Sequence, residues 1–385
     1  MSQFDRIINR RGTDSFKWDG NQVLFGRGDL LPFWVADMDF ATPAPILDAI
    51  RARTGHPVLG YEIRSDEYFG VLADWLRRRH DWSVPREWLM FCPPSSIVGI
   101  YGVITQFTMP GDGIVVPSPN YGPLLKLVRD TGRRLVRNPL REKNGRFVLD
   151  TEALAASVDA GTRMIIISSP HNPTGRVFTR SELEALAAVA RAHDLVVVSD
   201  EVHADLVLPG HRHIPYGSID AGRSVTVMSP NKTFNTAGLP QATLVMPDEN
   251  MRAHFKAFLD TTQLNHDSTF GAVAMIAGYR DCEPWLDELI EYLAGNHWLV
   301  ADYLERHVPQ VRKVPAEATY LAWLDCRRLG QSEADIMRLL VDKGGVGLYG
   351  GPEFGPDGEG FFRMNIACPR DTLRQGLQGI RRALA

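Results

Sequence analysis

The chain has 385 residues, of which 44% are hydrophobic and 23% charged, and its formal net charge is −4. This length allows two lobes, or one large domain with a smaller one folded onto it, and the composition excludes a disordered chain. The weak negative charge offers no field for nucleic acid or an anionic membrane, and no apolar run approaches the ~20 residues of a membrane-spanning helix. The four cysteines lack metal-ligand or disulfide spacing, and the charged N-terminal residues include no apolar leader. We therefore expect a soluble cytoplasmic protein without a bound metal.

Helical and strand patterns alternate from about residue 41 to 260, which predicts an α/β fold. The helix expected at 180–194 begins with a capping box formed by Thr179 and Glu182. It connects a strand ending at Ser168 to one beginning at Leu195, so this segment is a βαβ crossover between parallel strands.

Three unbroken apolar runs are typical of strands covered on both faces of a parallel sheet. They occupy residues 164–167, 195–198 and 224–228. The polar residues Asn172, Asp200 and Lys232 follow these runs in that order. Taken singly, each could be a helix cap, a turn residue or an exposed charge. Because ligands of parallel sheets bind beyond the carboxyl ends of the strands, the three together predict one site.

The residue types at these strand ends match the needs of pyridoxal phosphate. A buried lysine loses part of its preference for the ammonium form, which makes its amine available for a Schiff base. The cofactor also needs a carboxylate that keeps its pyridine nitrogen protonated, a donor to O3′, and hydroxyl and N–H groups around its phosphate. We assign Lys232 to the Schiff base, Asp200 to the pyridinium, Asn172 to O3′ and Ser229 to the phosphate.

A second lobe is expected from about residue 284, where a long amphipathic helix begins. The segment 345–350 spells G-x-G-x-x-G, but a helix precedes it and prolines and glycines follow it. We therefore reject a dinucleotide fingerprint and expect a flexible loop. His211 and His213 are expected as a surface pair in a polar turn. The remaining elements of this lobe are a strand at 319–325, a helix at 331–343, a strand at 361–367 and a last helix.

Nearly the whole sequence resembles the fold-type-I, class I/II aminotransferase superfamily. Within it, the chain is similar to the branch of cystathionine β-lyases and cysteine-S-conjugate β-lyases, mainly through KWD, ADMDF and His203. The resemblance is carried by RRGTDSFKWD (10–19), FWVADMDF (33–40), SPHNPTGRVF (169–178), SDEVHADL (199–206), NKTFNTAGL (231–239), TYLAWLDC (319–326) and FFRMNIACPR (361–370).

This resemblance implies that the chain is divided into an arm and two domains. Residues 1–40 would form an N-terminal arm that packs with the small domain. Residues 41–283 would form a large domain that binds pyridoxal phosphate on a mostly parallel seven-stranded sheet flanked by helices. Residues 284–385 would form a smaller α+β domain.

The resemblance also implies roles around the cofactor and the substrate. Arg363 would clamp the α-carboxylate of the substrate. Tyr121 would stack on the pyridine ring, and His203 would lie near O3′, where aminotransferases proper often have a tyrosine. Ser95 and Ser96 would offer N–H groups to the phosphate at a helix N-terminus, where anions bind readily.

A homodimer with shared active sites is implied as well. Tyr61 would reach the phosphate of the cofactor in the neighbouring subunit. Together with Lys232 and Tyr121, it is a candidate catalytic residue.

The implied activity is that of a carbon–sulfur β-lyase, which cleaves L-cystathionine or a related cysteine S-conjugate to a thiol, pyruvate and ammonia. Several departures from the branch leave the substrate open. Among them, Asn231 stands where a serine is usual, and Tyr349 lies in a loop that commonly carries a small polar residue. An aminotransferase shares every assigned residue and is one alternative. A lyase of specialised metabolism acting on a bulky thiol conjugate is another, and a regulatory role through protein contact stays open.

Overall fold

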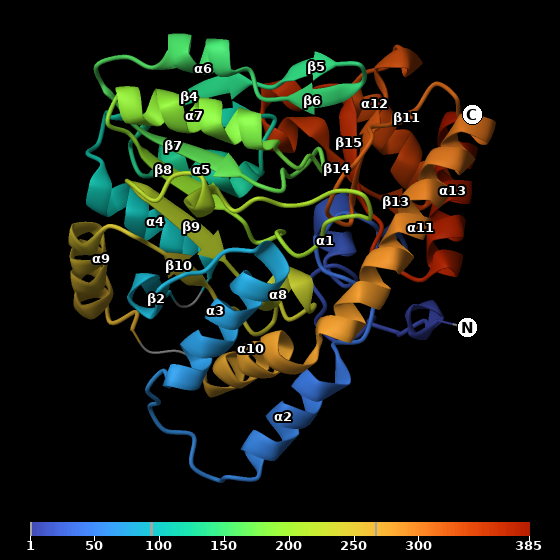
Figure 1. Cartoon of the computed structure of the whole chain (residues 1–385). Coiled ribbons are helices and arrows are strands. Elements are labelled where there is room, and N and C mark those ends of the chain that lie inside the picture. The colour runs from blue at the N-terminus through green and yellow to red at the C-terminus, as the bar shows by residue number, and fades with distance from the viewer. Residues whose placement is uncertain (1, 93–94, 266–267) are drawn as a thin grey trace.

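A computed structural model describes residues 2–92, 95–265 and 268–385. Its centre is a seven-stranded sheet with helices on both faces (Figure 1). One strand, β10, runs antiparallel to both of its neighbours, and the other pairs of neighbouring strands are parallel, so the predicted mostly parallel sheet is confirmed. The strand order is β2 (Leu89–Phe91), β10 (Thr243–Val245), β9 (Ser224–Met228), β8 (Val196–Asp200), β7 (Thr162–Ser168), β3 (Gly113–Ser118) and β4 (Arg134–Pro139).

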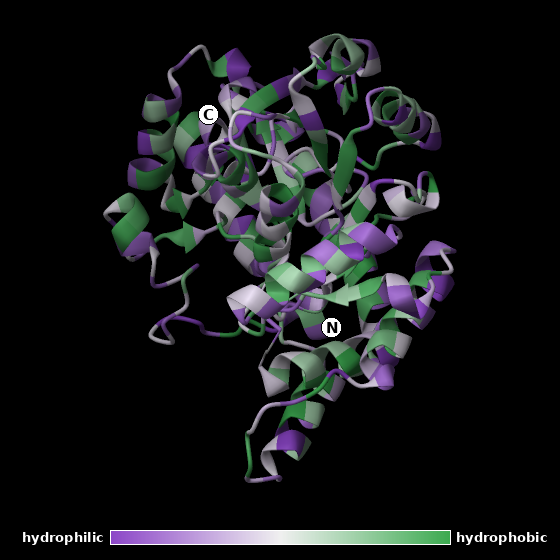
Figure 2. Ribbon diagram, turned by 90° about the vertical axis from the view of Figure 1, so that its left-hand side faces the viewer, coloured by the Kyte–Doolittle hydropathy of each residue, from purple (hydrophilic) through white to green (hydrophobic). Residues whose placement is uncertain are grey.

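Both faces of the central strands are buried, which explains their unbroken apolar sequences. In β7, Met164 and Ile166 belong to one hydrophobic core, whereas Ile165 and Ile167 belong to the other. Hydrophobic strands accordingly lie inside a shell of helices that are polar on one side (Figure 2). The first core includes α4 (Ser96–Phe107), α5 (Gly122–Asp130) and α9 (Glu249–Thr262), and the second includes α6 (Thr151–Ser157) and α7 (Arg180–Ala192).

The crossover helix α7 begins as its sequence predicts. Thr179 is the N-cap residue and its side chain accepts a hydrogen bond from the Glu182 N–H, while the Glu182 carboxylate accepts one from the Thr179 N–H. The helix joins β7 to its parallel neighbour β8, so the predicted βαβ unit is confirmed.

The part of the chain from the long helix α11 (Glu283–His307) onward, here called the second lobe, contains a four-stranded antiparallel sheet. The helix expected at 331–343 ends earlier as an α-helix and continues as a π-helical turn over Leu340–Gly344. The other elements are β11 (Arg312–Lys313), β12 (Leu321–Asp325), β15 (Phe361–Asn365), β14 (Tyr349–Gly350), α12 (Glu333–Leu339) and α13 (Arg370–Leu384).

The segment 345–350 is not the flexible loop that its glycines suggested. Its first part is β13 (Val346–Gly347), which pairs in parallel with β1 (Leu31–Pro32), and its second part is β14, which pairs with β15. A Cβ on Gly347 would lie 2.7 Å from the ring of Phe25, so this glycine permits close packing here rather than motion.

Further helices surround the lower part of the molecule in Figure 1, where the segment between α2 and α3 extends away from the rest of the chain. The helices in this lower part are α1 (Asn21–Phe25), α2 (Ala44–Thr54), α3 (Asp66–His80), α8 (Pro230–Thr233) and α10 (Thr269–Asp281). A small hairpin of β5 (Arg141–Lys143) and β6 (Arg146–Val148) lies near the second lobe.

No helix of the described residues is both long and apolar enough to cross a membrane.

All four cysteines are free thiols in the interior. Burial raises the pKa of Cys92, Cys282 and Cys326 to about 12 and also raises the pKa of Cys368. The thiolate form is therefore scarce at neutral pH at each of these positions.

A buried ion cluster joins the two lobes. Arg176, in the loop after β7, binds both carboxylate oxygens of Glu317 at 2.9 Å, and Glu317 lies shortly before β12. Arg176 also binds Glu182 at 2.8 Å, and the Val177 N–H donates to Glu317 at 2.8 Å. Because Asn172 lies in the same loop as Arg176, the cluster fixes this predicted site residue relative to the second lobe.

We expect Glu317→Ala to lower the free energy of unfolding by ~3–5 kcal/mol, because it leaves the Arg176 guanidinium buried without its main counter-charge. Glu184→Ala is the matched control, since Glu184 is 57% exposed and lies 3.8 Å from Arg180. This exposed pair contributes less than ~1 kcal/mol. Urea unfolding of both variants measures the difference, and equal losses would contradict the role of the cluster.

Candidate active site

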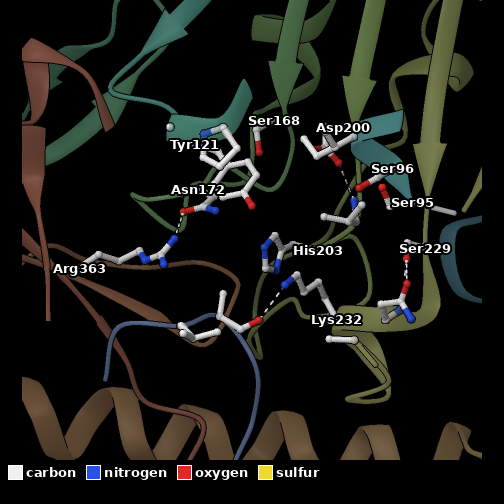
Figure 3. A pocket seen from close by; sticks show the side chains of 18 of the residues that line it. Ser95, Ser96, Tyr121, Ser168, Asn172, Asp200, His203, Ser229, Lys232 and Arg363 are labelled. Atoms are coloured by element: carbon white, nitrogen blue, oxygen red, sulfur yellow. Dashed lines mark hydrogen bonds between the residues drawn. The ribbon is translucent and has the colours of Figure 1, made fainter. Parts of the chain in front are cut away.

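A cavity of about 410 Å³ lies at the carboxyl ends of the central strands, between the sheet and the second lobe (Figure 3). All of the predicted site residues except Tyr61 line it. They are Ser95, Ser96, Tyr121, Asn172, Asp200, His203, Ser229, Lys232 and Arg363.

The strand ends bring the three central residues together as the sequence predicts. Asp200 is the last residue of β8 and lies opposite Ser168, the last residue of β7, after which the chain reaches Asn172. Ser229 follows β9 and caps the short helix α8, which carries Lys232. These strands are neighbours in the sheet, so side chains distant in sequence share one cavity.

The Lys232 amine is buried and donates a hydrogen bond to the Ala36 carbonyl at 2.7 Å. Burial, together with the nearby Arg363 guanidinium, lowers its pKa to about 8 against the attraction of Asp37 and Asp200. At neutral pH this lysine therefore has a much larger neutral fraction than an exposed one. A neutral amine can act as a nucleophile or a base.

Asp200 is a buried carboxylate that forms no ion pair within the described part of the chain. Among the described residues its side chain accepts one hydrogen bond, from the Val202 N–H at 3.4 Å. Burial raises the pKa of Asp200 to about 6, although Lys232 acts in the opposite direction. A protonated ring nitrogen at this position would supply the missing donor and positive charge.

Arg363 reaches the cavity from β15 in the second lobe, and 2% of it is exposed. Its Nη1 donates to Asn172 Oδ1 at 3.1 Å and its Nη2 to the Trp34 carbonyl at 2.9 Å. The rings of Tyr349 and Phe354 lie 5.2 and 4.8 Å from the guanidinium carbon. Burial lowers the pKa of Arg363 to about 10, so it remains a cation at neutral pH.

His203 lies between Lys232 and the strand ends (Figure 3). Burial, together with the charges of Lys232 and Arg363, lowers its pKa to about 3, so the imidazole is neutral. Its Nδ1 is buried without a partner among the described residues. Burial also raises the pKa of the nearby Tyr121, which keeps its hydroxyl protonated.

Asn231, one of the departures from the lyase branch, holds the loop that follows the lysine. Its Nδ2 donates to the Thr236 and Leu239 carbonyls at 2.6 and 2.9 Å, and its Oδ1 accepts from the Gln241 N–H at 2.9 Å. Ser229 Oγ donates to the Gln241 carbonyl at 2.6 Å. Both side chains are thus part of the local loop structure, and the phosphate role of Ser229 stays a prediction.

The start of α4 borders the cavity with two of the predicted phosphate ligands. Ser95 is the N-cap residue and its side chain accepts from the Val98 N–H at 3.4 Å, and Ser96 is the first helical residue. The first N–H groups of a helix lack intrahelical partners, so this end is suited to an anion.

Tyr61 lies outside the cavity, between α2 and α3, and is 91% exposed. Its predicted role depends on a second subunit. Sequence reasoning did not identify Phe16 and Ala36, which line the cavity, or Tyr320, which contacts His203. These residues lie within the stretches that carry the family resemblance, so that pattern contained a signal for them.

The expected surface position of His213 is wrong. This histidine is 3% exposed, and its Nε2 lies 2.7 Å from Glu201 Oε2. Glu201 directly follows Asp200 and is itself buried, and a buried carboxylate requires a partner of this kind. His211 is exposed, as expected.

Comparison with known proteins identifies the family to which a chain with this cavity belongs. The family described as aminotransferase class I and II matches residues 29–380. The chain belongs to this family. It is 39% identical to a cystathionine β-lyase, PatB of Bacillus subtilis (strain 168), over 99% of this chain and all of that one. The resemblance inferred from the sequence is therefore confirmed.

Solved structures agree with the fold of this family member. Cystalysin from Treponema denticola, which contains a pyridoxal 5′-phosphate cofactor, has a TM-score of 0.96 at 30% identity and covers 100% of this chain and 99% of its own. The C–S lyase from Staphylococcus hominis, bound to the same cofactor, has a TM-score of 0.92 at 31% identity, with coverage of 99% and 98%. The predicted fold-type-I α/β architecture is confirmed.

The cavity fits pyridoxal phosphate on its own chemistry. Lys232 offers an amine whose lowered pKa enlarges its neutral fraction, and Asp200 offers a buried carboxylate that forms no ion pair with the described cations. The orphaned Nδ1 of His203 and the Asn172 amide border the same space, and the start of α4 offers N–H groups to a phosphate. These residues could hold the cofactor.

We expect incubation with pyridoxal phosphate and borohydride to attach the cofactor covalently to Lys232. Lys313 is a matched reference within the same chain, because burial lowers its pKa to about 8 as well, but it lies on β11 outside the cavity. Peptide mapping should find the label at Lys232 and its loss in Lys232→Ala. Equal labelling of Lys313 would show that a lowered pKa, rather than the site, selects the lysine.

Proposed function

We propose that this chain is a pyridoxal-phosphate-dependent carbon–sulfur β-lyase. It cleaves L-cystathionine or a related L-cysteine S-conjugate with one water molecule to give a thiol, pyruvate and ammonia. The observation that carries the proposal is the meeting of Lys232, Asp200 and Arg363 in one cavity. The choice of reaction is supported by the B. subtilis relative, which is named a cystathionine β-lyase and matches over both full lengths.

Arg363 is positioned to bind the α-carboxylate of an amino acid. Two of its nitrogens are held by Asn172 and Trp34, and its Nε is buried without a partner among the described residues. A substrate carboxylate would supply the missing acceptor through charge-assisted hydrogen bonds. The rings of Tyr349 and Phe354 on the guanidinium restrict its motion, so the substrate meets an already oriented group.

The bound cofactor supplies a conjugated ring that accepts the electron pair released at the substrate Cα. Asp200 holds a proton on the pyridine nitrogen and so increases this capacity. The neutral Lys232 amine takes the proton from Cα. Arg363 fixes the α-carboxylate while the Cβ–S bond breaks and the sulfur leaves with its bonding pair. His203 stays neutral and adds no positive charge beside the amine.

The wall of the cavity near Arg363 is aromatic, and this favours a bulky thiol substituent over a small one. Phe354 and Tyr349 lie beside the guanidinium, and Trp34 contacts Tyr349 with a ring distance of 5.5 Å. Phe16, which is 70% exposed, packs on Trp34 at 4.9 Å and lines the cavity. The proposed substrates therefore include cysteine S-conjugates with apolar or aromatic thiol substituents as well as cystathionine.

We expect release of pyruvate and thiol from L-cystathionine or S-benzyl-L-cysteine to exceed amino-group transfer to 2-oxoglutarate. Both reactions need Lys232, so Lys232→Ala is the control that should lose both. The measurement is the ratio of free thiol to glutamate formed by the loaded protein. Steady transfer that outpaces thiol release across a panel of conjugates would replace the lyase by an aminotransferase.

The proposed enzyme is a cytoplasmic homodimer in which each subunit completes the site of the other. Large apolar side chains are exposed beside Tyr61, namely Val58 at 62%, Leu59 at 60% and Ile63 at 90%. An exposed apolar group of this kind is typical of a protein interface. We propose that this segment meets a second copy and that Tyr61 reaches the phosphate in the partner's cavity. The free, buried cysteines are in keeping with a reducing compartment.

Mixing Tyr61→Phe with Lys232→Ala subunits is expected to restore activity that neither variant has alone. A mixed dimer contains one fully native site if Tyr61 acts across the interface, so random exchange restores about a quarter of the native sites. Tyr101→Phe, at another exposed tyrosine, is the control and should keep its activity. Absence of any gain after subunit exchange would refute the shared site.

A further inference from the structure

The residues 34–38, here called the carbonyl strap, border the cavity, and each of their backbone carbonyls accepts a hydrogen bond from a side chain. The donors come from residues 232–235, from the second lobe and from residues 10–17, so the strap connects these three parts of the chain. The bonds are Trp34 O with Arg363 Nη2 (2.9 Å), Val35 O with Asn365 Nδ2 (2.5 Å), Ala36 O with Lys232 Nζ (2.7 Å) and Tyr320 Oη (3.0 Å), Asp37 O with Asn365 Nδ2 (2.5 Å) and Lys17 Nζ (3.2 Å), and Met38 O with Arg10 Nη1 and Asn235 Nδ2 (both 3.1 Å).

The strap is fixed independently of Lys232. The Asn365 amide binds the carbonyls on both sides of Ala36 and closes the bend on which Ala36 lies. Tyr320, which is 1% exposed, donates to the Ala36 carbonyl itself, and its ring packs against His203 at 5.9 Å. A carbonyl oxygen has two lone pairs, so the lysine bond and the tyrosine bond coexist.

A buried ion cluster holds the far end of the strap. Asp39 binds Lys17 at 2.7 Å, Arg10 at 2.8 Å and the Trp18 Nε1–H at 2.8 Å. Lys17 is 1% exposed and Asp39 5% exposed. The N-terminal arm therefore reaches the active site through the strap, which gives a physical role to two of the sequence stretches that carry the family resemblance.

We propose that the Ala36 carbonyl is the anchor for the Lys232 amine whenever this amine is free during turnover, and that Tyr320 is a positioning residue that holds the anchor. The inference rests on the proposed function, in which Lys232 takes the α-proton. A lysine amine ends a flexible four-carbon chain and can point in many directions. A hydrogen bond from one N–H to the Ala36 carbonyl limits this freedom and directs the lone pair of the neutral amine toward the substrate Cα. The amine therefore spends a larger fraction of its time in an orientation that can remove the α-proton.

The test is Tyr320→Phe, which removes one hydroxyl and keeps the ring packed on His203. Tyr216→Phe is the matched control, because Tyr216 is equally buried, its hydroxyl has no partner among the described residues, and it lies outside the cavity. For Tyr320→Phe we expect kcat for thiol release to fall about fivefold to tenfold with KM unchanged. The isotope effect with α-deuterated substrate should rise, because proton removal from Cα becomes slower relative to the other steps.

A second readout does not depend on turnover. The cofactor-free full-length protein is treated with a limiting amine-reactive reagent, and mass spectrometry gives the labelling of Lys232 relative to Lys313. Tyr320→Phe should raise this ratio severalfold, because the amine leaves its anchor more often, whereas Tyr216→Phe should not change it.

The anchor is refuted if Tyr320→Phe leaves the labelling ratio and kcat unchanged, or if KM rises while the isotope effect stays the same. These results differ from a failure of the proposed function, which would appear as absence of thiol release by the unmodified protein. The labelling comparison tests the anchor even in that case.

Discussion

Burial of the Lys232 amine beside Asp200 and Arg363 is the constraint on which the rest of this structure depends. Taking charged groups out of water costs several kcal/mol for each group unless partners compensate. The central sheet is covered by helices on both faces, so its strands offer a ligand only their ends. The chain places its functional charges there and surrounds them with a large hydrophobic core that offsets their cost.

The two lobes contribute complementary halves of the site. The central sheet provides the amine, the carboxylate and the Asn172 amide, whereas the second lobe provides the guanidinium on β15. Their relative position therefore decides whether a substrate can touch all of these groups at once. The Arg176–Glu317 pair and the carbonyl strap both connect the lobes through direct hydrogen bonds, which a large displacement of one lobe would break.

The strands and their polar ends could be predicted because each signal lies within a short run of sequence. Unbroken apolar residues followed by Asn172, Asp200 and Lys232 required no knowledge of distant contacts, and neither did the capping box of α7. The strap could not be predicted, since backbone carbonyls carry no side-chain signal. The two-residue strands β13 and β14 are too short for a periodic pattern, and the burial of His213 follows from its tertiary contact with Glu201.

The four interior cysteines have a particular meaning for an enzyme that produces thiols. Oxidation of a released thiol gives a disulfide, which an accessible protein thiolate attacks to form a mixed disulfide and release one thiol, so the product would become attached to the protein. Here every cysteine is buried and its raised pKa keeps it protonated, so the nucleophilic form is nearly absent. The chain can thus work in a thiol-rich solution without forming mixed disulfides.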